Sequence, residues 1–295
     1  MVRTALELRK ESERTGSTLL LFILLTQLTS FLKEHCLDGL GSWLYCGVVV
    51  LFQLLSVLVP YLFLVHGKDN CMQGYGKLGK AEAYLIIPLF FAVFFLYYSA
   101  GIVNSSLFSD TAGYLTEDLE LPGNKYESVL FFVSYVILSA VLEELYFRKA
   151  MISVLRPYGK WFAVTMSSLL FSVSHWKVSR VIPVFVSAFF LGLSYYETDN
   201  LSVPTSVHLL NNLFAFLTIL ISSKIGPEVA YSAVLAVVVV GFLSLIVLIM
   251  VLPMGKIFSS EGSLTADGKQ FFTWPVIAAV IVYTAILIDS CGVFR

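Results

Sequence analysis

Charged residues are scarce in this chain. Asp, Glu, Lys and Arg make up 13% of its 295 residues, whereas a soluble domain carries about 25%. Hydrophobic residues make up 58%, and the mean hydropathy is +0.84. A surface with so little charge cannot be kept in water, so lipid must be the solvent for most of the protein. The net charge of −1 gives no basic surface for nucleic acid.

Cysteine is rare as well. The four cysteines stand apart from one another, so neither a disulfide framework nor a cysteine-rich zinc site is indicated. The chain also lacks His-Glu-x-x-His, the common signature of a zinc protease. We therefore expect no cofactor, and a metal site would require residues from separate helices to converge in space.

Long apolar runs, in contrast, recur along the whole chain. About 20 mostly apolar residues cross the hydrocarbon of a bilayer. We expect an all-α, polytopic membrane helical bundle of about eight or nine transmembrane helices, with residues 1–295 forming a single membrane domain. The candidate spans are 18–32, 43–65, 81–103, 129–147, 161–176, 181–196, 201–222, 229–252 and 271–288.

The distribution of Lys and Arg predicts the orientation. The N-terminus is basic, and Lys and Arg are more frequent in the loops that alternate with it than in the other set. The positive-inside rule then places the N-terminus in the cytoplasm. The acidic loop 104–126 fits the opposite side. A plasma membrane and an endoplasmic reticulum membrane fit this integral, multi-pass protein equally.

Ionisable residues inside membrane spans are costly and by default mark function. The first such group is Glu143-Glu144-x-x-x-Arg148, near the end of the fourth span. Glu144 and Arg148 are four residues apart, so they share a helix face and can pair. Glu143 lies about a quarter-turn away. This pattern leaves one carboxylate available as a general base for water.

Two histidine segments complete the set. His175 lies late in the fifth span, four residues after Phe171. His208 and Asn212 lie one helical turn apart in the seventh span. A glutamate, two histidines and an asparagine can thus converge from three helices, within a motif-bearing core at about residues 127–222.

In this order, Glu-Glu-x-x-x-Arg, Phe-x-x-x-His and His-x-x-x-Asn on successive membrane helices resemble the CAAX protease and bacteriocin-processing family. These are intramembrane endopeptidases related to the Ras-converting enzyme. The resemblance implies that Glu143, helped by His175, activates the attacking water. It implies that Glu144 and Arg148 support the site, and that His208 and Asn212 donate hydrogen bonds to the oxyanion.

We therefore expect a glutamate-dependent intramembrane endopeptidase that acts on a peptide or a lipidated protein in contact with membrane lipid. Its substrate would be a prenylated CaaX tail that loses its C-terminal tripeptide, or a membrane-associated peptide. For Glu143 to lie as deep in the membrane as His175, the fourth helix must continue beyond Phe147 towards Pro157, with Arg148 buried against Glu144.

Other interpretations remain open from the sequence. Glu143, His175 and His208 are residue types that zinc accepts, so a metalloprotease is the alternative mechanism. A non-catalytic membrane scaffold of the same fold, binding a protein partner, is the alternative function. A proton-coupled transporter is disfavoured because the chain has no internal repeat. Each histidine taken singly could also serve as a hydrogen-bonding contact between helices.

Overall fold

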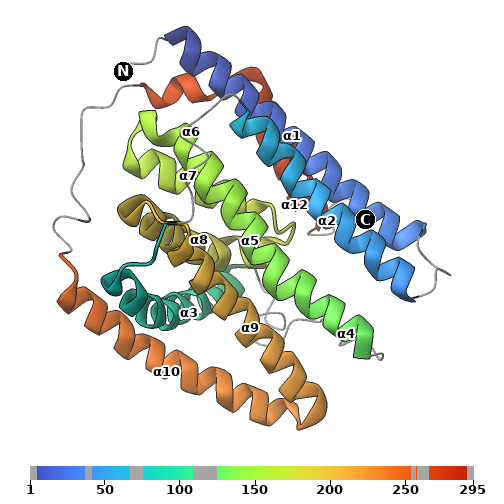
Figure 1. The fold of residues 1–295 in the computed structure, drawn as a ribbon, viewed down its shortest axis with the longest axis vertical. Coiled ribbons are helices and arrows are strands. Elements are labelled where there is room, and N and C mark those ends of the chain that lie inside the picture. The colour runs from blue at the N-terminus through green and yellow to red at the C-terminus, as the bar shows by residue number, and fades with distance from the viewer. Residues whose placement is uncertain are drawn as a thin grey trace.

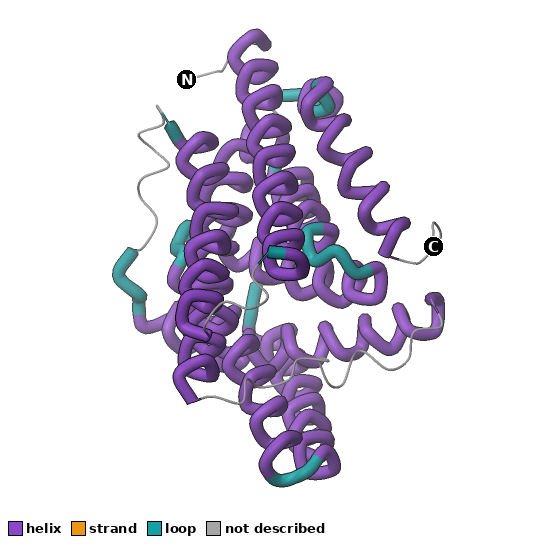
Figure 2. Tube along the Cα trace, turned by 90° about the vertical axis from the view of Figure 1, so that its right-hand side faces the viewer, coloured by secondary structure: helices purple, strands orange, loops and turns teal. Residues whose placement is uncertain are grey.

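The computed structural model describes residues 5–36, 42–66, 76–108, 125–253, 257 and 266–290. Over these residues the regular structure is entirely helical, without a strand (Figure 2). The longer helices are α1 (Ala5–His35), α2 (Ser42–Val65), α3 (Lys80–Phe108), α7 (Lys160–Val173), α8 (Val178–Thr198), α9 (Ser202–Lys224), α10 (Pro227–Val251) and α12 (Trp274–Ser290).

One further helix is continuous from Glu127 to Tyr158 and is called the central helix here. Its parts are α4 (Lys125–Phe132), the π-helix η2 (Val133–Leu138), α5 (Ser139–Glu143), the π-helix η3 (Glu144–Ile152), α6 (Ser153–Leu155) and the 3₁₀ turn η4 (Arg156–Tyr158). A separate 3₁₀ turn, η5 (Gly268–Phe271), precedes α12.

Seven helices in the described residues are long and apolar enough to cross a membrane. They are α1, α2, α3, the central helix, α8, α9 and α10. The apolar helices α7 and α12 are shorter. The prediction of a polytopic helical bundle is confirmed, and the chain is an integral, multi-pass membrane protein. The helices α7 and α12 correspond to the predicted spans 161–176 and 271–288.

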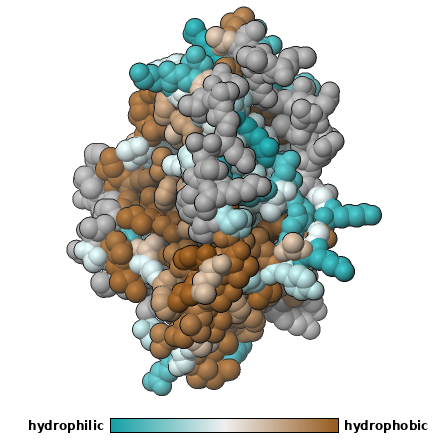
Figure 3. All heavy atoms as spheres, turned by 90° about the vertical axis from the view of Figure 1, so that its left-hand side faces the viewer, coloured by the Kyte–Doolittle hydropathy of each residue, from teal (hydrophilic) through white to brown (hydrophobic). Residues whose placement is uncertain are grey.

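The outer surface is apolar where lipid would lie. Figure 3 shows a broad hydrophobic area, with hydrophilic residues gathered towards the edges of the molecule. On α10, many large apolar side chains are exposed, among them Leu235, Phe242, Val247 and Met250. In water such a surface would cause association, whereas hydrocarbon solvates it at no cost.

The helices form two groups on either side of the central helix (Figure 1). In one group α1 packs against α2 and α12, and in the other α3 packs against α8 and α10. Close approach in the second group depends on Gly241, because a Cβ there would collide with the carbonyl oxygen of Phe91. Small residues at such contacts are typical of membrane helices, where dispersion forces favour tight packing.

The central helix continues well past Phe147, as the sequence predicted from the required depth of Glu143. No proline interrupts it before Pro157, and it ends where Gly159 adopts φ +95° and the chain turns into α7. A side chain at Gly159 would be strained in that conformation. The two π segments flank α5 on both sides, and such wide turns are frequent at functional sites.

Candidate active site

The central helix buries an ion pair in the middle of the protein. Nε of Arg148 lies 3.1 Å from Oε2 of Glu144, and the two side chains are 1% and 0% exposed. The guanidinium of Arg148 also stacks over the ring of Phe171, with Cζ 4.4 Å from the ring centroid. The predicted pairing is therefore present, and Arg148 is held both by a carboxylate and by an aromatic face.

Glu144 connects this pair to His208 on α9. Nδ1 of His208 donates to Oε1 of Glu144 over 2.8 Å. Because one ring nitrogen is engaged, the orientation of the imidazole is set, and Nε2 is directed at Glu143. Nε2 lies 3.9 Å from Oε2 of Glu143. That separation is too long for a direct hydrogen bond. A water molecule in the cavity beside the two side chains could contact both atoms at once.

The two adjacent glutamates thus have different surroundings. Glu144 is fully buried, with the guanidinium of Arg148 beside one oxygen and His208 beside the other. The side chain of Glu143 is 25% exposed and faces a cavity. The separation of a structural carboxylate from an available one follows from their positions on the helix, as expected from the sequence.

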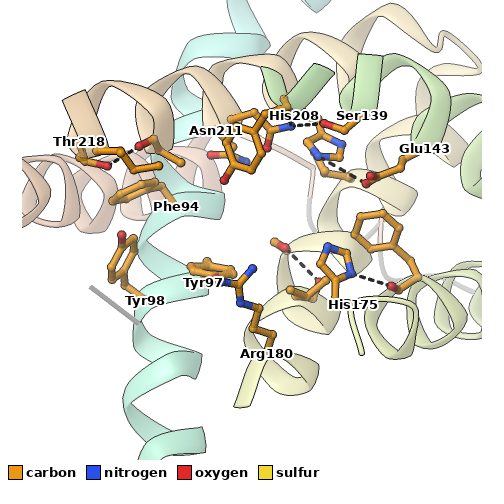
Figure 4. A pocket seen from close by; sticks show the side chains of 18 residues that line it. Phe94, Tyr97, Tyr98, Ser139, Glu143, His175, Arg180, His208, Asn211 and Thr218 are labelled. Atoms are coloured by element: carbon orange, nitrogen blue, oxygen red, sulfur yellow. Dashed lines mark hydrogen bonds and ion pairs between the residues drawn. The ribbon is translucent and has the colours of Figure 1, made fainter. Parts of the chain in front are cut away.

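His175 lies on the opposite wall of that cavity, in the turn that follows α7 (Figure 4). Its Nδ1 is 3.0 Å from the carbonyl oxygen of Phe171, so the same residue that stacks on Arg148 also fixes this imidazole. The ring of Phe171 contacts both histidines, with centroid distances of 4.9 Å to His175 and 6.0 Å to His208. Phe171 is the packing residue between the three helices that carry the motifs.

Asn212 is engaged by the central helix. Its Nδ2 donates to the carbonyl oxygen of Tyr135 over 3.1 Å and to the hydroxyl of Ser139 over 3.0 Å. Both hydrogens of the amide are therefore used. Tyr135 lies in the π-helix η2, and Ser139 also donates to its carbonyl. Asn212 joins α9 to the start of α5 beside Glu143.

These residues surround a cavity of about 320 Å³, which is within the usual size range of a ligand pocket. Of the six predicted site residues, Glu143, His175, His208 and Asn212 line it, while Glu144 and Arg148 lie behind its wall. The remaining wall includes residues that the sequence interpretation did not single out. They are Phe94, Tyr97, Tyr98, Ser139, Arg180 and Asn211, together with apolar side chains of α8 and α9.

A signal for two of these residues was present in the sequence. Asn211 is the neighbour of Asn212, and Arg180 is an ionisable residue close to the predicted sixth span. Its position alone does not distinguish Arg180 from an ordinary loop cation, because span ends commonly carry charge. Tyr97 and Tyr98 on α3 carried no signal, because an aromatic pair in an apolar span is typical of packing.

No group of three or more Asp, Glu, His and Cys side chains is arranged to hold a metal ion within the described ranges. Glu143 and His208 approach each other. The adjacent carboxylate, Glu144, already pairs with Arg148 and His208. The side chains present would not fit zinc, which takes three protein ligands in a catalytic site.

Comparison with known proteins finds similarity over the part of the chain that carries this arrangement. A family model described as "Type II CAAX prenyl endopeptidase Rce1-like" matches residues 125–214, which include all six predicted site residues. The chain is 33% identical over 121 residues to "Membrane-embedded CAAX protease MroQ" of Staphylococcus aureus (strain USA300). That alignment covers 38% of this chain and 46% of the relative, so less than half of the relative is matched. No solved structure matches the chain.

The fold and the site define a multi-pass membrane protein with a polar cavity built from three motif-bearing helices. Residues 125–214, which carry the motifs, are similar to the CAAX protease and bacteriocin-processing family, as those motifs predicted.

Proposed function

We propose that this protein is an intramembrane endopeptidase in which Glu143 activates water. The observation that carries the proposal is the contrast between the two adjacent glutamates. Glu144 is paired on both oxygens, whereas Oε2 of Glu143 faces the cavity with Nε2 of His208 only 3.9 Å away. A water molecule beside them would contact a carboxylate that can take its proton. A carboxylate that removes a proton from water needs no covalent enzyme intermediate.

His208 and Asn212 are the donors that would stabilise the oxyanion as the scissile carbonyl becomes tetrahedral. Nε2 is the ring nitrogen of His208 that Glu144 leaves available, and His208 lines the cavity. Nε2 can donate to the oxyanion while Nδ1 donates to Glu144 only when the ring is the imidazolium, which carries a proton on both nitrogens. To reach the oxyanion, Nδ2 of Asn212 would have to give up its hydrogen bond to the hydroxyl of Ser139. That hydroxyl would still donate to the carbonyl oxygen of Tyr135. His175, on the opposite wall, would assist the transfer of the proton to the leaving amine.

The cavity favours an apolar peptide as the substrate. Phe94, Tyr97 and Tyr98 form an aromatic wall of the cavity. The long helices that enclose it are apolar enough to lie within the membrane. A membrane-anchored or lipidated protein can present such a peptide from within the bilayer. The names of the matched family and relative support a prenylated CaaX tail that loses its last three residues, with a membrane-associated peptide as the alternative substrate.

Peptide cleavage by the purified full-length protein in detergent tests this function. Prenylated and unprenylated CaaX reporters and a mixed peptide pool would be compared for wild type, Glu143→Gln and Glu228→Gln. Glu228 is a matched control because it lies at the start of α10, outside the cavity. We expect Glu143→Gln to lose all cleavage and Glu228→Gln to keep it, with no effect of a metal chelator.

The other outcomes are informative. Loss of cleavage with chelator would replace the glutamate mechanism with a metalloprotease. Absence of cleavage of every substrate by a monodisperse wild-type protein would favour the non-catalytic scaffold.

A further inference from the structure

We propose that Arg180 binds the free C-terminal carboxylate of the substrate and thereby restricts cleavage to peptide bonds near a chain end. This inference rests on the proposed peptidase function and names a determinant of its specificity. It concerns a residue that lies outside the three motifs.

The first observation is the charge inside the cavity. Among the described residues that line it, Arg180 is the one Lys or Arg, and Glu143 is the one Asp or Glu. In Figure 4 the guanidinium of Arg180 rises into the cavity between Tyr97 and His175, while Glu143 lies on the opposite wall with His208. The Arg180 side chain is partly buried, and ionisable groups at such positions in membrane proteins by default mark function. Its planar group matches a carboxylate in geometry.

The second observation is that the backbone around Arg180 is fixed. Asn104, near the end of α3, is fully buried and donates through Nδ2 to the carbonyl oxygen of Ser179 over 3.0 Å. The amide of Arg180 itself donates to the carbonyl of Lys177 over 3.0 Å in the first turn of α8. A buried side chain from another helix therefore anchors the residue next to Arg180. Such anchoring reduces the ordering cost of binding.

The third observation is the aromatic wall on α3. The rings of Phe94 and Tyr98 contact each other at a tilt, with their centroids 4.6 Å apart, and the ring of Tyr97 is 5.5 Å from that of Tyr98. Phe94 also contacts Phe214 of α9 edge-on at 4.9 Å. An extended peptide advances about 3.3 Å per residue, so three residues span about 10 Å between a scissile carbonyl and a terminal carboxylate. The aromatic wall offers an apolar surface for the side chains between these two polar ends.

The charges give the bound peptide a direction. A carboxylate would be repelled by Glu143 and attracted by Arg180, so the C-terminus is expected at Arg180 and the reacting carbonyl at Glu143 and His208. A peptide whose C-terminus is amidated would lack this attraction.

The test compares two fluorogenic reporters that are identical except for a C-terminal free acid or a C-terminal amide. Full-length wild type, Arg180→Gln, Arg180→Lys and Lys177→Gln would be assayed in detergent. Lys177→Gln is the matched control, because Lys177 is an exposed cation three residues away and does not line the cavity. We expect wild type to prefer the acid by about tenfold or more in kcat/KM, the scale of one charge-assisted hydrogen bond.

In Arg180→Gln the ratio of acid to amide should fall close to one, and Arg180→Lys should keep part of it, because a lysine supplies charge without the planar fork. Lys177→Gln should retain the wild-type ratio. An unchanged ratio in Arg180→Gln, or equal cleavage of both reporters by wild type, would overturn the assignment of Arg180 and leave the peptidase function standing.

Equilibrium binding separates the two proposals. In Glu143→Gln, labelled acid and amide peptides would be compared with and without the additional Arg180→Gln change. If wild type cleaves neither reporter, yet the acid binds more tightly and only when Arg180 is present, the peptidase proposal fails and the carboxylate site stands. If acid and amide bind equally in Glu143→Gln, the site is rejected.

Discussion

Nδ1 of His208 and Oε1 of Glu144 are 2.8 Å apart, although 64 residues separate them in the chain. This contact links α9 to the central helix and orients the other ring nitrogen of His208 towards Glu143. Glu144 in turn is held by Arg148. Arg148 therefore orients Glu144, and Glu144 orients His208. This relay ends at Glu143, the one carboxylate among the described residues that line the cavity.

The relay predicts that Glu144 and His208 act as a unit. Glu144→Gln should lower kcat by roughly 10- to 100-fold, the scale seen when a partner that orients a reacting histidine is removed. His208→Ala should lower it at least as much. The double variant should be about as slow as His208→Ala alone, because the two changes remove one function. Fully additive losses in a steady-state peptide assay would mean that the contact does not orient His208.

Removal of Arg148 should destabilise the protein. Arg148→Ala leaves the fully buried carboxylate of Glu144 without its cation, and breaking a buried pair costs about 3–5 kcal/mol. The double variant Arg148→Met with Glu144→Gln should recover part of that loss, because no unpaired charge remains. Arg156→Ala is the control, since its pair with Asp199 has side chains 37% and 72% exposed and is worth about 0–1 kcal/mol. Thermal unfolding in detergent ranks the variants by stability. Equal decreases in Tm for Arg148→Ala and Arg156→Ala would contradict this prediction.

Variants of Asn212 and Ser139 distinguish two roles of Asn212, as a donor to the oxyanion or as a packing contact. If Asn212 reaches the oxyanion, Asn212→Ala should lower kcat by about 10²- to 10³-fold. Ser139→Ala removes only the hydroxyl that shares Nδ2 of Asn212 and should cost no more than several-fold. Equal losses in both variants, with equal loss of thermal stability, would assign Asn212 to the contact between α9 and the central helix.

The predicted orientation can be measured by cysteine labelling. Four full spans separate Ala5 from Tyr158, so Arg156 and its partner Asp199 lie on the side of the N-terminus. Lys224 is at the far end of α9. In a background with the native cysteines replaced by serine, Asp199→Cys should react with an impermeant maleimide only after the membrane is opened, and Lys224→Cys should react in intact cells. The reverse pattern would place the N-terminus outside.

The aromatic wall can be tested separately from the reacting groups. Tyr98→Ala should raise KM for an apolar reporter more than it lowers kcat, because the ring would hold the peptide in both the ground state and the transition state. Phe242→Ala, on the lipid-facing surface of α10, removes an aromatic side chain of similar size outside the cavity. A change in KM of the same size in both variants would indicate a general effect on the bundle.

The sequence by itself determined the helical membrane class of the protein and pointed to its candidate site residues. Its low charge and repeated apolar runs of about 20 residues indicated an all-helical membrane bundle, since a helix satisfies its backbone groups within its own segment. The few ionisable and strongly polar residues in those runs, with the family motifs they resemble, pointed to Glu143, Glu144, Arg148, His175, His208 and Asn212. The spacing of Glu144 and Arg148 on one helix was enough to predict their ion pair.

Only the tertiary structure decided how those helices meet. The contact of His208 with Glu144, the engagement of Asn212 by Tyr135 and Ser139, and the entry of Arg180 into the cavity join elements far apart in the chain. The sequence pattern could not predict these contacts. The spacing of polar residues identifies the face of a helix on which they lie, but it does not identify the helix that packs against that face. The rotation of the central helix also depends on two π-helical turns, which have no reliable signature in the sequence.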